Sequence, residues 1–532
     1  MRIIKLQVSF KLFLLIFYLS SNLFFAQSFF DAGFGKNGIV FPEINAQVNG
    51  AWSLSLQKDN KIILTGWAYS DEESPSDISL VRLFENGETD SSFNPDGLFS
   101  IGSSTWEDAL ASAVQEDGKI LIAGRYYNGR SWDFLIVRFN EDGSIDSSFR
   151  HRGYITKDFG KDDRAFDIAV QNDGKILVCG FAERFNWDFA VSRFNQDGSI
   201  DTTFGEKGSL LLNIGTYNDV AFSIKVQKDK KIIVCGWTYI FGSWDFAIVR
   251  LNPDGSLDKT FGSTGIVTTD YYSQYNTAHS VAIRSDGKYV AAGYTEKLGY
   301  SDTDIMLVRY NTDGTIDHSF GDNGIVLADY ENADDFAWVV KFDKYDKLVV
   351  GGNTTINNSK ILQVARFNSD GSPDISFGEN GILVTQIAGF DEECRDLLIQ
   401  SDGKILLTGY YTDRESTKTF VIRLTNPYNY INSTPEILSN NFPNPFNSST
   451  KIIYTIPEYL ISENQRVVHV MIKVYDLLGR EIETLVDDDQ EPGIYEVIFA
   501  SQNNSIELSS GIYFYRIQVG SISFVKKMML IR

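Results

Sequence analysis

The chain has 532 residues, a formal net charge of -22, and 43% hydrophobic and 14% aromatic residues. This composition is typical of a globular protein with more than one folding unit and excludes a largely disordered chain. The acidic charge repels nucleic acid phosphates and anionic lipid, so we expect no nucleic acid partner. Three cysteines are too few for a disulfide framework.

Residues 1–26 have the layout of a secretory signal peptide, with a basic start, an apolar stretch and a small-residue exit at Ala26. A membrane anchor is the weaker interpretation because the apolar stretch is short and is followed by Ser20, Ser21 and Asn22. No later stretch approaches the ~18 uninterrupted apolar residues of a spanning helix. We therefore expect an exported mature chain without a membrane-spanning segment.

Residues 27–426 repeat one pattern seven times. Its best-kept phrase is an Asp-Gly-Lys turn before an apolar run that ends in Gly, as at residues 117–124. Its lysine recurs at steps of 58, 56, 56, 57, 59 and 57 residues, at Lys61, Lys119, Lys175, Lys231, Lys288, Lys347 and Lys404. Such a regular period indicates stacked or radially arranged copies of one unit.

Each unit contains four predicted strands. One is a short apolar segment opened by Gly, as at residues 38–40, and the next is an alternating stretch such as 165–171. The turn Asp173-Gly174, a two-residue hairpin signal, leads to a strand at 175–180, and a further strand covers 187–194. No helical period occurs, so the pattern predicts an all-β fold, a seven-bladed β-propeller with four antiparallel strands in each blade.

Two further phrases occur seven times, an Asp-x-x-Phe ending and an Arg in the fourth strand of the unit. They are Asp31, Asp90, Asp146, Asp201, Asp258, Asp317 and Asp374, and Arg82, Arg138, Arg193, Arg250, Arg309, Arg366 and Arg423. The first Asp-x-x-Phe precedes the first full unit, and the last unit has none. The N-terminal segment can therefore complete the last unit, which favours a closed ring over an open array.

The repeated phrases resemble the delta-60 repeat family. The resemblance weakens at Asp346, where the Asp-Gly turn is altered, and at Ile361 and Lys418, which replace an Asp five residues before the Arg. Membership of this family implies an exported or surface repeat protein and supplies no catalytic residues to transfer.

Residues 427–440 are predicted to be a linker, and residues 441–532 a small Ig-like β-sandwich. Its predicted strands cover residues 451–456, 467–475, 481–486, 493–499, 511–519 and 523–531.

Four phrases of this last domain are similar to the C-terminal sorting domain, type A, of the type IX secretion system. They contain Pro443, Asn444, Pro445 and Phe446, then Asp476 and Gly479, then Gly511, and finally Lys526 and Lys527. The resemblance implies export across the outer membrane of a Bacteroidota-type bacterium with the type IX machinery as partner. It also implies removal of the domain and release or attachment at the cell surface. A sugar-binding sandwich is the alternative.

Signals for catalysis are sparse. The chain has four histidines, none spaced with another metal ligand as a zinc site requires, and neither a nucleophile elbow nor a phosphate-binding loop. We therefore expect a non-enzymatic binding or adhesion scaffold without catalytic residues or cofactor. A secreted hydrolase or lyase acting on polysaccharide and a structural surface-layer component remain the alternatives, because abundant carboxylates leave an acid–base pair possible.

Oxygen-bearing side chains alternate in the phrase Asn140, Asp142, Ser144 and Asp146 and in its repeats. Such a set is able to bind Ca²⁺, but the glycine is misplaced for a calcium loop and no bidentate Glu follows. An Asx-type turn explains the same residues and is the favoured interpretation.

Aromatic residues follow the glycine of the apolar run. They form a hypothetical binding face for an extracellular glycan or protein, although packing between blades is the favoured interpretation. They are Trp67, Phe181, Trp237, Tyr294 and Tyr410, with Tyr126 one place later in its unit, so six of seven blades are expected to present a ring on one side. Specificity is expected where blades differ, in loops around residues 67–77, 125–133, 181–188, 237–245, 294–304, 352–361 and 410–418.

Overall fold

The computed structural model describes most of the chain after residue 28. The described ranges are residues 29–69, 74–94, 96–102, 105–272, 275–296, 303–388, 391–413, 416–425, 441, 444–456, 467–491, 493–503, 506–519 and 522–531. The predicted signal peptide, the predicted linker and Pro443 lie outside them. The chain divides into two compact units, Met1–Thr425 and Asn426–Arg532, which are described separately below.

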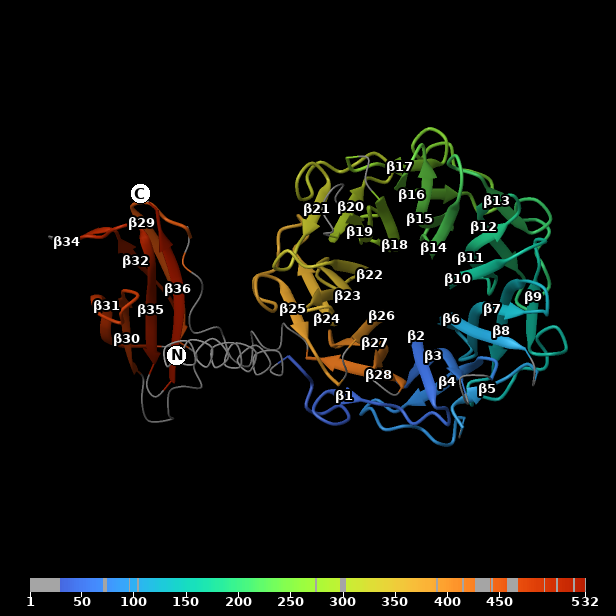
Figure 1. Ribbon diagram of the computed structural model, residues 1–532, viewed down its shortest axis with the longest axis horizontal. Coiled ribbons are helices and arrows are strands. Elements are labelled where there is room, and N and C mark those ends of the chain that lie inside the picture. The colour runs from blue at the N-terminus through green and yellow to red at the C-terminus, as the bar shows by residue number, and fades with distance from the viewer. Residues whose placement is uncertain are drawn as a thin grey trace, which may run out of the picture. The chain divides into compact units, whose positions relative to one another are not determined.

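Within the described residues, the first unit is a ring of seven four-stranded antiparallel sheets, the blades of a propeller (Figure 1). The first strands of successive blades contact each other around the axis, and β2 contacts β26, so the ring is closed. Blades 1 to 3 consist of β2 (Val48–Leu56), β3 (Ile62–Tyr69), β4 (Asp77–Leu83), β5 (Leu98–Phe99); β6 (Trp106–Val114), β7 (Ile120–Tyr127), β8 (Trp132–Phe139), β9 (Tyr154–Lys157); and β10 (Asp163–Val170), β11 (Ile176–Glu183), β12 (Trp187–Phe194), β13 (Ser209–Leu212).

Blades 4 to 6 repeat this order, and blade 7 takes its outermost strand from the N-terminus. They consist of β14 (Asp219–Val226), β15 (Ile232–Ile240), β16 (Ser243–Leu251), β17 (Ile266–Thr269); β18 (Tyr275–Ile283), β19 (Tyr289–Glu296), β20 (Thr303–Tyr310), β21 (Ile325–Ala328); β22 (Asp335–Phe342), β23 (Leu348–Ile356), β24 (Ser359–Phe367), β25 (Ile382–Thr385); and β26 (Asp391–Ile399), β27 (Ile405–Thr412), β28 (Thr417–Leu424), β1 (Ile39–Val40). The closed seven-bladed propeller predicted from the repeats is confirmed.

The ring closes because the N-terminal segment completes blade 7. Ile39 pairs with Ile422 in antiparallel register, and the backbone N–H of Asp31 donates to the carbonyl of Arg423 at 2.8 Å. This pairing covers the edge of β28 that would otherwise present free backbone groups. The first Asp-x-x-Phe precedes the first full unit, and the last unit lacks this phrase, because the two ends of the array together form blade 7.

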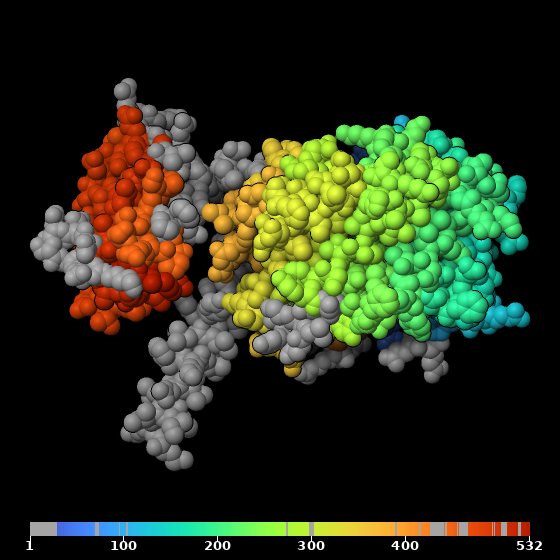
Figure 2. All heavy atoms as spheres, turned by 90° about the horizontal axis from the view of Figure 1, so that it is seen from above, coloured from blue at the N-terminus to red at the C-terminus, as the bar shows by residue number. Residues whose placement is uncertain are grey.

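The apolar core lies between blades rather than within one. Cys179 of β11 and Val191 of β12 pack in one cluster with Val234 of the next blade, and side chains of successive blades abut in the edge-on view of Figure 2. Cys179 and Cys235 are buried free thiols, and burial raises the pKa of both. They serve as small hydrophobic side chains in this packing.

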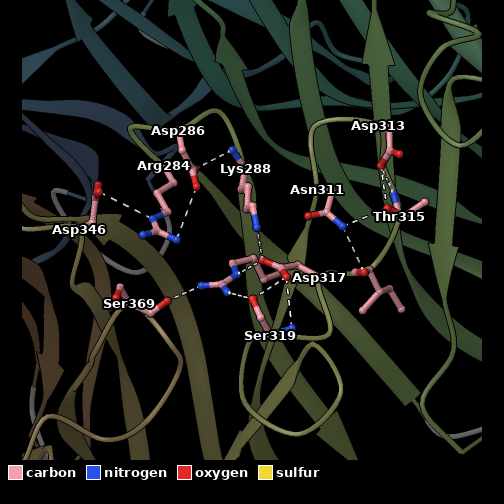
Figure 3. Close-up of polar contacts among 12 residues, drawn as sticks. Arg284, Asp286, Lys288, Asn311, Asp313, Thr315, Asp317, Ser319, Asp346 and Ser369 are labelled. Carbon is pink, nitrogen blue, oxygen red and sulfur yellow. Dashed lines mark hydrogen bonds and ion pairs between the residues drawn. The ribbon is translucent and has the colours of Figure 1, made fainter.

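A polar clamp recurs in the outer part of each blade and is shown for blade 5 in Figure 3. Asp317 accepts from Lys288 Nζ and from Arg309 Nε, each at 2.7 Å. The guanidinium of Arg309 lies 4.5 Å from the ring centre of Phe320 and donates to the carbonyl of Ser369 in blade 6. The repeated Lys, Arg and Asp-x-x-Phe phrases thus hold each blade together and join it to the next.

The two ends of the repeat array modify this clamp. In blade 7 the carboxylate comes from Asp31, which accepts from Arg423 at 2.8 Å and from Lys404 at 3.1 Å. In blade 1, Lys61 pairs with the turn residue Asp59 at 2.9 Å.

The repeated arginines lie on the third strand of each blade when strands are counted outward from the axis. They were predicted on the fourth strand of the sequence unit, because the short strand that opens each unit completes the preceding blade.

The Asp-Gly-Lys turns differ from the predicted two-residue hairpin. The N–H of Gln171 donates to the carbonyl of Lys175, and the N–H of Gly174 donates to the carbonyl of Gln171, so residues 172–174 form a three-residue loop. Gly174 has φ of 79°, which is the left-handed conformation that ends this kind of loop. Asp173 accepts from the N–H of Lys175 through Oδ1 and explains the repeated Asp.

The second unit contains a four-stranded antiparallel sheet in the order β31-β30-β35-β36 and a two-stranded antiparallel sheet of β29 with β32. These strands share one buried core, which includes Ile452, Val474 and Tyr515. The strands are β29 (Ser449–Ile456), β30 (Val468–Tyr475), β31 (Glu481–Gln490), β32 (Gly493–Ala500), β33 (Gln502–Asn503), β34 (Ile506–Glu507), β35 (Gly511–Val519) and β36 (Ile522–Leu530). Each of the six predicted strands has a counterpart here, with ends that differ by up to four residues.

No helix long and apolar enough to cross a membrane occurs in the part of the chain that the structure describes.

Candidate functional site

Each first strand carries one β-bulge, which places one side chain per blade at the axis. In β10 the register with β11 shifts between Ala165 and Asp167, so Phe166 is the extra residue. The equivalent residues, here called the axial ring, are Trp52, Leu110, Phe166, Phe222, His279, Trp338 and Arg395. A bulge re-aims a side chain, and here it does so at the same level in all seven blades.

The axial ring is a chain of contacts between neighbouring blades. Phe222 lies 4.6 Å from Phe166 and 4.5 Å from His279, measured between ring centres, and His279 lies 4.7 Å from Trp338. The guanidinium carbon of Arg395 continues the chain at 5.0 Å from Trp338 and 4.2 Å from Trp52. Six of the seven ring members are thus in sequential contact around the axis.

The glycine that ends each apolar run is required by the bulge. A Cβ on Gly180 would lie 1.8 Å from the carbonyl oxygen of Arg164 on the first strand, and the same close approach occurs at Gly124 and Gly236. Only glycine tolerates this approach. The repeated glycine was therefore the sequence signal for the axial ring, although the side chains of the ring themselves follow no repeated pattern.

The predicted aromatic residues lie on the second strand, one row away from the axial ring. The positions that share this register, here called the row, are Trp67, Arg125, Phe181, Trp237, Tyr294, Asn353 and Tyr410, paired with Gly50, Asp108, Arg164, Val220, Thr277, Phe336 and Glu393 of the first strands. Trp67, Trp237, Tyr294 and Tyr410 are partly exposed, whereas Phe181 is buried. The row therefore brings five predicted aromatic residues into equivalent places.

Tyr126 does not join this row. It comes one residue after Arg125, so its side chain points to the opposite face of β7 and packs with the apolar cluster between blades 1 and 2. Arg125 takes the row position, where its Nε donates to Asp108 at 2.5 Å and its guanidinium lies 4.2 Å from Trp132. The expectation of six rings on one side is thereby corrected to five.

Two aromatic residues that sequence reasoning did not select extend the row between blades 7, 1 and 2. Trp67 lies 6.0 Å from Tyr410 and 5.1 Å from Tyr69, and Tyr69 lies 6.2 Å from Trp106, between ring centres. Tyr69 and Trp106 also line a cavity of ~460 Å³ with Val48 and residues of blade 7. These rings form a continuous aromatic strip beside the axis.

The loops that join the second to the third strand in blades 3 and 4 lie at the same end of the ring as the row. Phe185 and Phe241, at equivalent places in the loops of blades 3 and 4, are 97% and 91% exposed. Trp187 stacks on Phe181 at 4.7 Å and Trp244 on Trp237 at 5.3 Å, so the third strands add further rings beside the row. Exposed apolar side chains gathered at one end of a propeller are typical of an interaction surface.

The charged groups beside the axis are held by hydrogen bonds and ion pairs with one another. Arg395 donates through Nη2 to Glu393 and, at 2.8 Å, to the hydroxyl of Tyr410, while Lys360 pairs with Glu393 at 2.6 Å. Burial, together with the charge of Arg395, lowers the pKa of His279 to about 3. The imidazole is therefore neutral and is a weak proton acceptor.

Carboxylates gather between blades 2 and 3, where oxygen atoms of Asp133, Asp158 and Asp163 lie within 4.8 Å of one another. Burial and the neighbouring carboxylates raise the pKa of Asp163 to about 7. Asp163 nevertheless accepts backbone N–H groups of Phe159 at 2.7 Å and Glu183 at 3.1 Å. These hydrogen bonds give it a structural role in anchoring the loop before β10.

The side chains of the calcium alternative bond to one another. Asp142 Oδ1 accepts from the N–H of Ser144 at 3.0 Å and from its hydroxyl at 2.6 Å, and Asn140 donates to the Ser144 hydroxyl at 2.9 Å. Asp146 is paired with Lys119 and Arg138, each at 2.8 Å. These contacts are those of the Asx-type turn that the sequence favours, and calcium binding stays the alternative for experiment.

The residues of the predicted sorting phrases have structural contacts. Asn444 accepts the N–H of Met529 at 2.9 Å and is joined to Pro445 by a cis peptide bond. Phe446 is buried in the core of the second unit, and its N–H donates to the carbonyl of Met529 at 2.9 Å. The first phrase is thereby attached to the last strand.

The remaining phrases lie on turns and strands of the same sheet. Asp476 accepts from Arg480 Nε at 2.6 Å, and Gly479 has φ of 76° in the turn between them. Gly511 begins β35, and Lys526 and Lys527 lie on β36, partly exposed and exposed respectively.

Comparisons with known proteins support this description. The family model "Domain of unknown function (DUF5122) beta-propeller" matches seven times, at residues 57–93, 115–149, 171–204, 227–261, 284–320, 346–377 and 400–426. The model "Secretion system C-terminal sorting domain" matches residues 440–531. No curated protein sequence shows significant similarity to this chain.

Several solved structures resemble the fold at low identity. Virginiamycin B lyase from Staphylococcus aureus is 12% identical with a TM-score of 0.39, covering 72% of this chain and 98% of its own. The polysaccharide lyase Uly1 is 10% identical with a TM-score of 0.41, over 73% and 90%. The β-propeller domain of the Trilobed protease from Pyrococcus furiosus is 12% identical with a TM-score of 0.38, over 72% and 96%.

Similarity at this level concerns the propeller fold and carries no argument about activity. The family matches are specific, since they fall on each of the seven repeats and on residues 440–531 of the second unit. The sorting domain indicates export by type IX secretion to the extracellular space or cell surface. The chain therefore belongs to the DUF5122, delta-60-type, β-propeller repeat family and carries a type IX secretion C-terminal sorting domain.

Proposed function

We propose that this exported propeller is a non-enzymatic binding scaffold, used in adhesion, that holds a carbohydrate on the end of the ring carrying the row. The observation that supports this most is the aromatic strip of Tyr410, Trp67, Tyr69 and Trp106, four partly exposed rings in succession beside the axis. Aromatic faces flanked by polar groups suit the apolar faces of sugar rings.

The axial ring supports surface binding over passage of a ligand through the propeller. Six side chains from consecutive blades contact each other at one level of the axis, and Leu110, the seventh, is buried. A ligand on the row is thus expected to rest on this layer. The neutral His279, with its lowered pKa, offers no strong base there, which agrees with a non-enzymatic role.

The direct test is a screen of the exported protein against immobilised glycans and proteins, followed by the combined variant Trp67→Ala, Trp237→Ala and Tyr410→Ala. We expect the variant to lose glycan retention while its melting temperature stays close to that of the wild type. Tyr345→Ala is the matched control, because this ring is 54% exposed in a turn at the opposite end of blade 6. Retention unchanged in the triple variant contradicts the proposal.

A second variant covers the case in which the triple substitution prevents folding. Phe185→Ala with Phe241→Ala removes two rings that are almost fully exposed, so the fold does not depend on them. Weaker retention by this variant supports the same face as the binding surface. Cleavage of polysaccharide by the exported protein would replace the proposal with the hydrolase or lyase alternative.

A further inference from the structure

The register positions of the row and the axial ring hold more arginines than carboxylates, in a protein whose formal net charge is -22. Charged residues in the row and the axial ring are Arg125, Arg164, Arg395, Asp108 and Glu393. Three arginines against two carboxylates leave one positive charge. Asp108 pairs with Arg125 and Glu393 pairs with Arg395, so the excess lies on Arg164.

Arg164 is partly buried, and the nearby carboxylates Asp162 and Asp108 form no ion pair with it. It stands opposite Phe181 in the register of β10 and β11, with its guanidinium 5.9 Å from the ring centre. Among the residues that the structure describes, it makes neither a hydrogen bond nor an ion pair, and its Nε is buried without an acceptor. Burial and the nearby Arg125 lower the pKa of Arg164, and the charges of Asp162 and Asp108 partly offset this effect.

Arg395 repeats this feature on blade 7. Its Nη2 is bonded to Glu393 and Tyr410, but its Nε is buried without an acceptor, between the rings of Trp52 and Trp338. Buried guanidinium donors are normally satisfied, because an unmade hydrogen bond destabilises the fold. A ligand cannot reach these buried Nε atoms, but the Nη groups of Arg164 are not buried and form no hydrogen bond among the described residues, so they are available to an acceptor supplied by a ligand.

We propose that the carbohydrate bound on the row is acidic, and that Arg164 is the principal contact for its carboxylate or sulfate group. This inference rests on the proposed function, because it names the chemical class of the ligand of the same site. A guanidinium binds such oxyanions through two parallel N–H groups, while the neighbouring rings hold the sugar faces.

The experiment measures binding of the exported protein to matched pairs of polymers by isothermal titration calorimetry. Polygalacturonate against its methyl ester tests a carboxylate, and carrageenan against agarose tests a sulfate. We expect tighter binding to at least one acidic member than to its neutral partner, and weaker binding as sodium chloride rises from 50 to 500 mM. Equal affinity for the acidic and neutral members of both pairs overturns the inference.

Arg164→Gln is expected to weaken binding of the acidic polymer about tenfold or more, the scale of one charge-assisted contact. Arg152→Gln is the control, because it removes the same charge from an exposed residue in the outer turn of blade 2. The melting temperature of Arg164→Gln should not fall, since no ion pair is lost. Wild-type affinity in Arg164→Gln contradicts the assignment.

The two proposals fail in different ways. If the wild type binds neutral and acidic polymers alike and only the aromatic variants lose binding, the acidic class is wrong and the carbohydrate site stands. If neither polymer class binds, or the aromatic variants bind as the wild type does, the proposed function itself is wrong.

Discussion

At the residue scale, the repeated Asp in six of the seven blades accepts from both a lysine and an arginine. Burial by itself raises the pKa of Asp317, but hydrogen bonds from Lys288 and Ser319 and the charge of Arg309 hold it well below its usual value. The side chains of Asp317 and Arg309 are only 7% and 4% exposed. Removing one partner of such a pair leaves a buried charge uncompensated.

We therefore expect Asp317→Asn to lower the free energy of unfolding by about 3 kcal/mol, measured by urea denaturation. Asp59→Asn is the control, since Asp59 is 48% exposed in its pair with Lys61, and we expect a change within about 0.5 kcal/mol. Equal changes in the free energy of unfolding for the two variants would show that burial of the clamp adds nothing to stability.

Two sets of carboxyl groups make the stability of the fold depend on pH in opposite directions. The clamp carboxylates have lowered pKa values in the folded state, so their stabilisation is present above the unfolded value of about 4 and is lost as the pH falls further. Glu107 and Asp335 behave in the opposite way, because burial raises the pKa of each to about 7. Their contribution is present below pH ~4 and is lost as the pH rises through 7.

A maximum of the melting temperature is therefore expected in mildly acidic solution, with a decline between pH 5 and 8. Asp335→Asn should flatten that decline, because the amide cannot ionise. Asp173→Asn, in an exposed hairpin turn, should leave the profile as it is in the wild type. A decline as steep in Asp335→Asn as in the wild type would refute the role of this carboxyl.

At the element scale, the turn after each third strand is built by its own side chains. Asn140, Asp142 and Ser144 bond to one another, and the carboxylate of Asp146 is occupied by Lys119 and Arg138. We expect that adding a chelator of calcium leaves the melting temperature unchanged, measured in dilute protein with trace calcium. A fall of several degrees that added calcium reverses would favour the metal interpretation instead.

The repeat pattern in the sequence did not reveal the β-bulge in each first strand. An alternating stretch with one extra residue still reads as a strand, and the extra residue is found only from its pairing partner. The glycine opposite it was visible seven times in the sequence. Its cause, the close approach of the first-strand carbonyl, became apparent from the paired strands.

At the scale of the whole molecule, the ring depends on one non-covalent seam between the N-terminal segment and blade 7. Phe34 is fully buried there, 4.5 Å from the guanidinium of Arg423, and packs with Val40 and Val421. The equivalent Phe320 packs with Arg309 inside a continuous part of the chain. The two residues thus make the same contact in different chain contexts.

We expect Phe34→Ala to open the seam locally, so that hydrogen exchange at Ile422 and its neighbours in β28 becomes faster. Phe320→Ala should instead lower the global free energy of unfolding, by about 3–5 kcal/mol, without selective exchange in blade 7. Identical exchange patterns in the two variants would mean that the seam is no weaker than the other blade junctions.

The sequence by itself determined the number of blades, their strands and the way in which the ring closes, because these follow from turn residues and alternation that recur in every unit. The tertiary structure decided which side chains meet at the axis. Trp52, His279 and Arg395 lie far apart in the chain and share no residue type. Their association follows from seven bulges brought to one level by closure, and so does the unpaired charge of Arg164, since a missing partner is defined only by its neighbours in space.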